Sequence, residues 1–304
     1  MLHVDFHMHS NASDGELAPE ALMDLAHERG VGALALTDHD TVAGVERASE
    51  RAARLGIAFV PGTELSCRYA STGIHLVALG FDTKAPAMRD FLARQRELRR
   101  LRSKCFDERF RAIGLTGVVA LAEKIAGNAA VMSRSHIASA LLEMGVVGDR
   151  NEAFERYIGN GKPCFVDLGW PDIREGVEVA HEAGGIIVLA HPGRYRFSCT
   201  AEHDAMIEAF RAAGGDGIEV SSGSQHPKCT DFYARVARSA SLLASTGSDF
   251  HRLESDRPGP GCQPPLPEGL RPVWESPVLE PFLGGVLEAL SKGEGNPQQG
   301  GTNP

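Results

Sequence analysis

MLHVDFHMHS at residues 1–10, followed by VGALALTDHD at residues 31–40 and IAFVPGTELS at residues 57–66, decides the fold of this chain. In the first stretch, apolar and polar residues alternate strictly. The apolar set is Leu2, Val4, Phe6 and Met8, and the polar set is His3, Asp5, His7 and His9. Because successive side chains of a strand point to opposite faces, this alternation predicts a strand with one apolar and one polar face.

The segments between these stretches have helical patterns. Pro19 begins an amphipathic segment that Gly30 ends, and a second apolar stripe runs from Val42 to Leu55 and stops at Gly56. Strands and helices that alternate with short links predict parallel pairing and an α/β architecture. Further strands are expected at GIHLVALGF (73–81), KPCFVDL (162–168), GGIIVLAHP (184–192), DGIEVSS (216–222) and SLLASTGSDFH (241–251), with helices around 177–183, 202–212 and 231–238.

The stretch from 85 to 161 breaks this rhythm, because it is poor in strand patterns and reads as helical. Candidate ligands lie on both sides of it, so an insert within one barrel-like domain explains the sequence better than two tandem domains. We therefore predict barrel parts at 1–84 and 162–285 and a mainly helical insert at 85–161. The extension at 286–304 is polar and rich in Gly, Gln, Asn and Pro from about Gly293, and its end is expected to be disordered.

Composition narrows the classes of function. The net charge of −9 disfavours binding of long duplex nucleic acid through a broad basic surface, but it allows a small phosphorylated substrate in a cleft that holds dications. No apolar run reaches the roughly 20 residues that cross a bilayer. The start of the chain lacks a signal-peptide pattern and the six cysteines include no C-x-x-C pair, so we expect a cytoplasmic protein with reduced thiols and no membrane or obligate protein partner.

Metal-ligating side chains recur at the same place in successive units. His7 and His9 share one face of the first strand, and Asp14 follows in the next loop. Further donors stand at or just after the ends of predicted strands: His39 in TDHD, Glu64 in PGTELS, His191 in LAHP, and Asp249 and His251 in TGSDFH. His75 lies near the start of its strand, so its place depends on the direction of that strand. The carboxyl ends of barrel strands are where such folds assemble active sites.

The acidic residues of this set require cations. Asp14, Glu64 and Asp249, with Asp38 and Asp40 nearby in sequence, would crowd carboxylates into one cavity. Two carboxylates about 6 Å apart repel by roughly 3 kcal/mol at an effective dielectric near 20. Two or three divalent cations would remove this conflict. Mixed imidazole and carboxylate donors suit manganese, with zinc or iron as the alternatives.

In order along the chain, the motifs H-x-H, an acid, T-D-H-D, G-x-E, a histidine, A-H-P and S-D-x-H resemble the PHP (polymerase and histidinol phosphatase) domain of the amidohydrolase-like superfamily. The resemblance covers the chain apart from the insert and the tail. It implies a distorted (β/α)7 barrel with metal ligands at the carboxyl ends of its strands. In that family pattern His7, His9, Glu64 and Asp249 would hold one cation, with Glu64 bridging to a second that His75 and His191 complete. Asp14, His39 and His251 would hold a third, although many family members have a histidine at the position of Asp14.

The AHPGRYR run, the RSHIA segment and the length resemble the subgroup of nucleoside 3′,5′-bisphosphate phosphatases and 5′–3′ oligoribonucleases. This resemblance implies that the insert caps the metal site and that Arg134, Ser135, His136, Lys162 and Arg194 contact phosphate. Phe91, Leu98, Leu101 and Cys105 are expected to form the buried stripe of the first insert helix, which leaves Arg99 and Arg102 as further candidates that face the cleft. Arginine suits this role because its planar fork matches two phosphate oxygens.

The expected reaction is phosphate ester hydrolysis by a metal-activated hydroxide. Glu64 and Asp249 would act through the metals, Arg134 and Arg194 would neutralise developing charge, and a metal-bound water or His136 would protonate the leaving group. The first expected substrate is a nucleoside 3′,5′-bisphosphate, such as pAp, which would lose its 3′-phosphate. The alternatives are 5′–3′ cleavage of short 5′-phosphorylated RNA, a non-catalytic metal-binding module, and hydrolysis of histidinol phosphate, to which no feature points.

Overall fold

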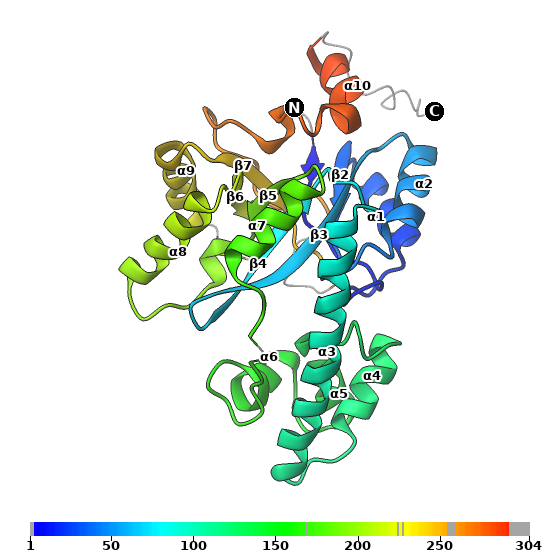
Figure 1. The fold of residues 1–304 in the computed structure, drawn as a ribbon. Coiled ribbons are helices and arrows are strands. Elements are labelled where there is room, and N and C mark those ends of the chain that lie inside the picture. The colour runs from blue at the N-terminus through cyan, green and yellow to red at the C-terminus, as the bar shows by residue number, and fades with distance from the viewer. Residues whose placement is uncertain (1–2, 168, 224, 227, 254–258, 292–304) are drawn as a thin grey trace.

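A seven-stranded sheet, whose strands follow one another in chain order, forms the centre of the molecule (Figure 1). The computed structural model describes residues 3–167, 169–223, 225–226, 228–253 and 259–291. The strands are β1 (Val4–Asp5), β2 (Ala33–Leu36), β3 (Ala58–Tyr69), β4 (Thr72–Leu79), β5 (Ile186–Leu189), β6 (Gly217–Ser222) and β7 (Leu243–Gly247). The first and last strands meet, because Phe6 N–H donates to Thr246 O (3.1 Å) and Met8 pairs in parallel with Phe250. The sheet is thus a nearly closed barrel, which confirms the predicted fold class.

One strand runs against the others. β4 is antiparallel to both β3 and β5, whereas the remaining pairs are parallel. In the β3–β4 hairpin, His75 lies opposite Ser66. The start of β4 therefore lies at the same end of the barrel as the carboxyl ends of its neighbours. Because β4 runs in the reverse direction, His75 near its start lies at the same end of the barrel as the carboxyl ends of the neighbouring strands.

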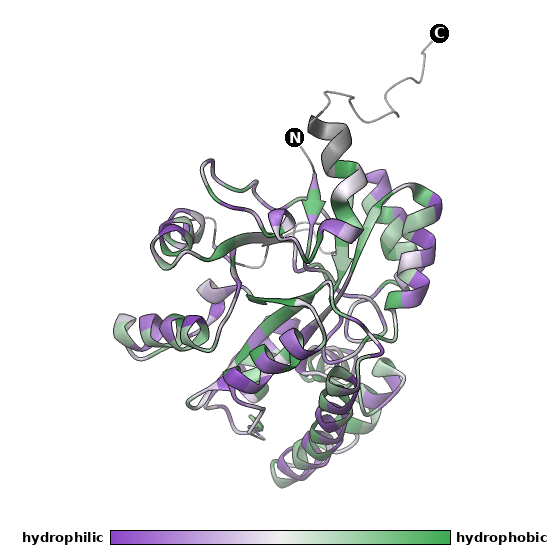
Figure 2. Cartoon of the chain, turned by 45° about the horizontal axis from the view of Figure 1, so that its top comes forward, coloured by the Kyte–Doolittle hydropathy of each residue, from purple (hydrophilic) through white to green (hydrophobic). Residues whose placement is uncertain are grey.

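Amphipathic helices surround the barrel, with their apolar sides on the sheet (Figure 2). In α2 the buried residues Val45, Ala48 and Ala52 share one face, and Gly56 ends the helix in a left-handed conformation (φ 72°). These helices are α1 (Pro19–Glu28), α2 (Val45–Leu55), α7 (Ile173–Glu182), α8 (Thr200–Ala212), α9 (Cys229–Ala240) and α10 (Glu280–Ser291), with short 3-10 turns η2 (Pro192–Arg194) and η3 (Val273–Glu275). No helix of the described residues is both long and apolar enough to span a bilayer.

A helical segment extends from one end of the barrel (Figure 1). It contains α3 (Pro86–Ala112), α4 (Val118–Ala126), α5 (Arg134–Glu143), α6 (Arg150–Ala153) and the π-helical turn η1 (Phe154–Ile158). α3 contributes to two cores: Phe91 packs with the barrel, whereas Phe106 and Phe110 pack in a separate cluster with α4 and α5. Residues 292–304, where the end of the extension was expected to be disordered, lie outside the described residues, and residues 286–291 continue α10.

Two local predictions were wrong. Residues 162–167 form turns and irregular backbone instead of a strand, and Leu168 lies outside the described residues. Cys164 and Val166 bury their side chains among the helices rather than against the sheet. The stripe expected on α3 was wrong in part: Phe91 is buried and Cys105 packs against the helical core, but Leu101 is 51% exposed and the buried face includes Arg99. The guanidinium of Arg99 can be buried on this face because Asp40 of the barrel forms an ion pair with it.

Candidate metal centre

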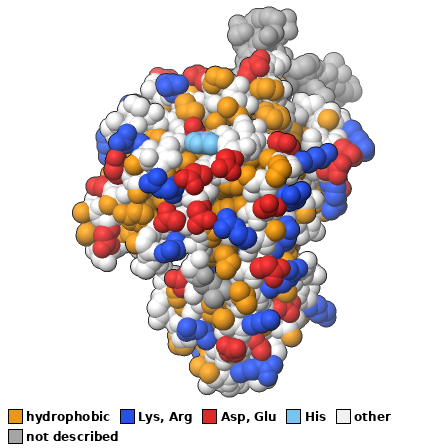
Figure 3. All heavy atoms as spheres, in the orientation of Figure 1, with side chains coloured by type: hydrophobic (Ala, Val, Ile, Leu, Met, Phe, Trp, Pro, Cys, Tyr) orange, Lys and Arg blue, Asp and Glu red, His pale blue; other side chains and the backbone are white. Residues whose placement is uncertain are grey.

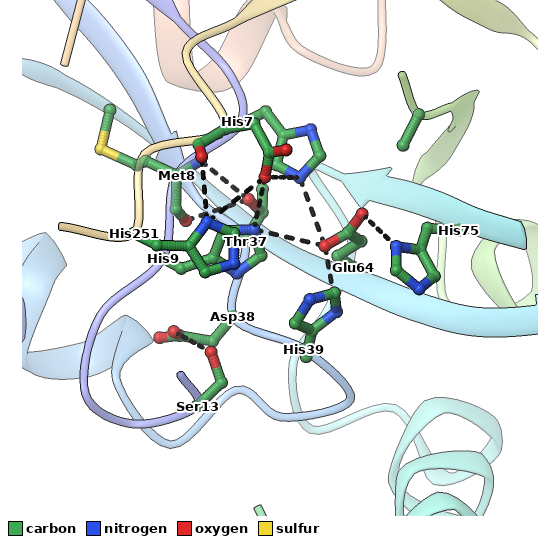
Figure 4. Close-up of polar contacts among 12 residues, drawn as sticks. His7, Met8, His9, Ser13, Thr37, Asp38, His39, Glu64, His75 and His251 are labelled. Atoms are coloured by element: carbon green, nitrogen blue, oxygen red, sulfur yellow. Dashed lines mark hydrogen bonds and ion pairs between the residues drawn. The ribbon is translucent and has the colours of Figure 1, made fainter. Parts of the chain in front are cut away.

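The predicted metal ligands gather at the carboxyl end of the barrel (Figure 4). His7 and His9 follow β1, and Asp14 lies in the loop after them. His39 follows β2, His191 follows β5, and Asp249 and His251 follow β7. Glu64 and His75 lie within the antiparallel β3–β4 pair. Strand direction therefore brings together side chains that are up to 244 residues apart in the chain (251 − 7).

Glu64 is fully buried at the centre of this cluster, and its two oxygens face different histidines. Oε2 lies 3.3 Å from His7 Nε2 and 3.2 Å from His9 Nε2. Oε1 lies 2.9 Å from His75 Nδ1 and 2.9 Å from His191 Nε2. One carboxylate with an oxygen toward each histidine pair has the geometry of a bridging ligand.

Three overlapping groups have donor atoms close enough together to hold a cation. They are His7, His9, Glu64 and Asp249; His9, Asp14, His39 and His251; and His39, Glu64 and His75. The first group is the set expected for one site. The second contains the three residues expected for the third site, with His9 added. His191 joins the remaining group through Glu64 Oε1 and lies 3.4 Å from His75 Nδ1 by its Nε2 atom.

The donor atoms fit divalent cations. Several buried atoms here have no hydrogen-bond partner: His7 Nε2, His9 Nδ1 and Nε2, Asp14 Oδ1, His39 Nδ1, Glu64 Oε2 and His191 Nδ1. Buried polar atoms are normally satisfied, so their concentration at one place indicates a missing ligand. Burial opposes ionisation of Glu64, but the facing histidines, His39 first, hold the pKa of its carboxyl well below its usual range. A cluster of imidazoles around ionised carboxylates suits manganese, zinc or iron.

Glu219 on β6 was not predicted. Its carboxylate is 2% exposed, and Oε1 lies 3.1 Å from His7 Nδ1 while Oε2 accepts a hydrogen bond from His191 N–H (2.5 Å). The only available signal was an acid between the apolar residues Ile218 and Val220 of the predicted strand. Asp5 was also overlooked, although it shares the polar face of the first strand. It accepts hydrogen bonds from Ser248 N–H (2.9 Å) and Gly261 N–H (2.8 Å), and so anchors the loop that carries Asp249.

Asp38 and Asp40 do not crowd the metal cavity as the sequence suggested, because each has its own partners. Asp38 accepts hydrogen bonds from the hydroxyls of Ser10 and Ser13, both at 2.6 Å, and thus fixes the loop that carries Asp14. Asp40 forms a buried ion pair with Arg99 of α3 (2.5 Å).

Arg134, Ser135 and His136 begin α5, and His136 lies within electrostatic reach of Asp14 and His251. Arg134 stacks over Phe154 and Phe165, and no carboxylate of the described residues lies within ion-pair distance of it. Burial, together with repulsion from Arg194, lowers the pKa of Arg134 to about 10. Burial also lowers the pKa of His136 to about 4. Ser133 N–H donates to His136 Nδ1 (3.0 Å), so the neutral ring carries its proton on Nε2.

The other candidate substrate contacts lie in different settings. Arg194 is 43% exposed and pairs with Asp249 Oδ2 (2.7 Å). Lys162 is exposed in the turn after η1. Arg102 is buried between Phe106 and Trp170 and donates to Val166 O (3.3 Å), while Arg99 also stacks on Trp170. Of the predicted substrate contacts, Arg194 thus touches the candidate ligand Asp249, His136 lies within electrostatic reach of Asp14 and His251, and Arg99 joins α3 to the barrel.

Comparison with known proteins agrees with this geometry. The PHP domain family matches residues 5–160. A 3′,5′-nucleoside bisphosphate phosphatase of Chromobacterium violaceum is 37% identical over 284 residues, which covers 92% of this chain and 99% of that protein. A 5′–3′ exoribonuclease of Haemophilus influenzae is 37% identical over 271 residues, which covers 89% and 97%. A solved structure of an amidohydrolase from C. violaceum with bound sulfate and no metal has a TM-score of 0.85 at 38% identity and covers 90% of this chain and 94% of its own. With its barrel, its ligand set and its relatives in agreement, the chain belongs to the PHP domain family.

Proposed function

We propose that this protein is a metal-dependent phosphoesterase that removes the 3′-phosphate from nucleoside 3′,5′-bisphosphates, as in the conversion of pAp to AMP and phosphate. The observation that carries the proposal is the buried donor cluster around Glu64 with two arginines linked to it: Arg194 pairs with Asp249, and its charge acts on Arg134. Arg134 has no acidic partner among the described residues, and a desolvated arginine without one attracts an anion. A phosphate bound between Arg134 and the metal ligands would give this arginine an anionic partner and would contact the cations that the metal ligands hold.

The chain's own residues would divide the work. His7, His9, Glu64 and Asp249, with His75 and His191 on the other oxygen of Glu64, would hold two cations, and Asp14, His39 and His251 a third. Divalent cations bound there would supply a water of lowered pKa and neutralise phosphate charge. Arg134 and Arg194 would orient the phosphate oxygens, with Ser135 and Lys162 as further contacts. The preferred metal is proposed to be manganese, with zinc or iron as alternatives.

His136 is proposed to donate a hydrogen bond rather than to carry a catalytic proton as an imidazolium. A histidine with a pKa of about 4 is neutral near pH 7, and its Nε2–H remains available because Nδ1 accepts from Ser133. Asp14 and His251 both act on the pKa of His136, so the ring lies beside the group formed by His9, Asp14, His39 and His251. The proton for the leaving group would then come from solvent held in the metal site.

The helical segment 86–158 is proposed to be the cap over the metal site, since α5 brings His136 within electrostatic reach of Asp14 and His251. Acidic and basic side chains are interspersed over α3 and the neighbouring face of the barrel (Figure 3). Such a face lacks the continuous basic track that long nucleic acid needs. A small nucleotide fits this charge distribution better.

Stepwise 5′–3′ cleavage of short 5′-phosphorylated RNA is the second candidate, because relatives of equal similarity are 5′–3′ exoribonucleases. A single measurement separates the two. Phosphate release from adenosine 3′,5′-bisphosphate is compared with mononucleotide release from a short 5′-phosphorylated RNA, each with manganese, magnesium and zinc. Phosphate release that exceeds RNA cleavage in kcat/KM supports the phosphatase, and the reverse order supports the exonuclease. No hydrolysis of either ester by metal-loaded protein would favour a non-catalytic metal-binding module.

A further inference from the structure

Glu219 joins two metal ligands that come from different parts of the barrel. One carboxylate oxygen meets the ring of His7 after β1 (3.1 Å), and the other accepts from the backbone N–H of His191 after β5 (2.5 Å). His7 belongs to the group with His9 and Asp249, whereas His191 faces the other oxygen of Glu64 together with His75. The two contacts of Glu219 therefore reach both sides of the bridging carboxylate.

Both partners of Glu219 are hydrogen-bond donors. The N–H of His191 can only donate, and His7 must carry its proton on Nδ1 if Nε2 is to bind a cation. His191 also has an unusual backbone conformation (φ 27°, ψ 55°) that a non-glycine residue adopts only when its surroundings hold it there. The two oxygens of the Glu219 carboxyl accept from both donors at once.

We propose that Glu219 is a positioning residue that fixes the His7 ring and the His191 backbone and so holds both histidines in place for the cations that the cluster around Glu64 would bind. The proposal rests on the metal centre of the proposed function and not on its substrate. Among the described residues, Glu219 contacts Nδ1 of His7 and the backbone N–H of His191, neither of which would bind a cation. It therefore acts through the two histidines.

Glu219→Gln tests this with almost no change of shape. The amide has one accepting oxygen and one donating NH2 group, so one of the two donors must face another donor. Either the tautomer of His7 changes, which leaves a proton on the nitrogen aimed at the cation, or the backbone of His191 loses its acceptor. In both cases one ligand is mispositioned while the side-chain volume stays the same.

Asp216 provides a matched control at the opposite end of the same strands. Its carboxylate also joins a histidine ring and a backbone N–H: Oδ2 lies 2.8 Å from His181 Nε2 and accepts from Ile187 N–H (2.9 Å). Ile187 lies near the start of β5, whereas His191 follows its end. Asp216→Asn therefore makes the same chemical change between the same two strands, away from the metal ligands.

The experiment is a Mn²⁺ titration of EDTA-stripped full-length protein, with free Mn²⁺ followed by electron paramagnetic resonance and folding by circular dichroism. Glu219→Gln is expected to bind Mn²⁺ about 10–100-fold more weakly than wild type, in line with the loss of an outer hydrogen bond to a metal-ligating histidine. Its hydrolytic activity should recover as Mn²⁺ is raised. Asp216→Asn should bind Mn²⁺ as wild type does, even if it melts at a lower temperature.

Wild-type Mn²⁺ affinity and stoichiometry in a folded Glu219→Gln variant would overturn the proposal, and so would an equal loss of affinity in Asp216→Asn. If Glu219→Gln does not fold, Glu219→Asp replaces it: the shorter carboxylate keeps the charge but cannot reach both donors, so weakened Mn²⁺ binding is again expected and normal binding overturns the proposal. Because metal binding is measured without substrate, a protein that binds Mn²⁺ but hydrolyses no phosphate ester would refute the proposed function and leave this test intact.

Discussion

At the scale of single residues, the metal centre depends most on Glu64, because its two oxygens serve different ligand groups. Glu64→Ala should lower turnover by several orders of magnitude and reduce the bound metal, since one substitution removes a ligand from both sides. Metal content measured by elemental analysis and phosphate release from adenosine 3′,5′-bisphosphate check this. Glu182→Ala, an exposed glutamate at the end of α7, is the control and should leave both unchanged. Normal activity and metal content in Glu64→Ala would refute the ligand assignment.

His136 makes stability depend on pH. Its pKa is about 4 in the folded protein against an ordinary value of 6.5, so the unfolded chain binds a proton that the folded state refuses between these values. The contribution of His136 to the free energy of unfolding is therefore fully present above pH 6.5 and is lost as the pH falls toward 4. His136→Asn cannot titrate, so its stability relative to wild type should improve by roughly 2 kcal/mol from pH 7 to pH 5. Urea unfolding of EDTA-treated proteins at both pH values measures this, and a pH-independent difference would contradict it.

The residues that could be predicted from sequence are those that repeat a placement. His7, His39, His191 and Asp249 each follow a strand, and repetition at strand ends is visible without a structure. Glu219 could not be predicted, because a single acid inside a strand does not repeat the placement of donors at strand ends. Its role depends on two neighbours that the fold brings to it from 212 and 28 residues away.

At the scale of elements, α3 is held to the barrel by a buried ion pair. Arg99 is 3% exposed and contacts Asp40, which is 1% exposed and directly follows the candidate ligand His39. Arg99→Met leaves the carboxylate of Asp40 without its cation, and we expect a loss of about 3–5 kcal/mol in the free energy of unfolding. Urea denaturation of the metal-free protein measures it.

Arg100→Met is the control for this prediction, because Arg100 is the next residue of α3 but pairs with Glu97 on the surface. Its loss should change stability by less than about 0.5 kcal/mol. If Arg99→Met instead keeps wild-type stability and raises only the KM for the nucleotide, then Arg99 contacts substrate as the sequence suggested.

Element types were predictable where the apolar period was clear, as in α2 or β5. The direction of β4 could not be predicted, because a strand in an antiparallel hairpin and a strand in a parallel pair can have the same alternation of apolar and polar residues. The strand expected at residues 162–168 failed for a related reason: Cys164, Phe165 and Val166 form a short apolar run, but the surface that buries Cys164 and Val166 is helical. The pattern of apolar residues indicates which residues are buried, but it does not show whether a sheet or a helix packs against them.

At the scale of the whole molecule, closure of the barrel depends on Gly247 at the end of β7. A Cβ atom there would lie 2.7 Å from the backbone nitrogen of His7 and would overlap its Cβ. Gly247→Ala should therefore destabilise the protein by about 3 kcal/mol or more and displace His7 from the metal centre. Thermal melting with and without Mn²⁺ checks both effects, because a displaced His7 should also reduce the stabilisation that Mn²⁺ provides.

Gly285→Ala is the matched control for Gly247→Ala. Gly285 lies in α10 with open space where its Cβ would be, so alanine should raise stability by about 0.5–1 kcal/mol. A Gly247→Ala protein that melts as wild type does and keeps the Mn²⁺-induced shift would show that β1 and β7 can separate without harm to the site.

The pairing of the first and last strands also makes two of the donor groups a property of the closed barrel. His7 and His9 follow β1, whereas Asp249 and His251 follow β7. The group around His7 and the group around Asp14 each draw donors from both of these places. A fragment that ends before residue 249 would therefore carry the histidines of the first strands without either group, and cleavage of the chain between β1 and β7 would weaken cation binding even where the ligands themselves are intact.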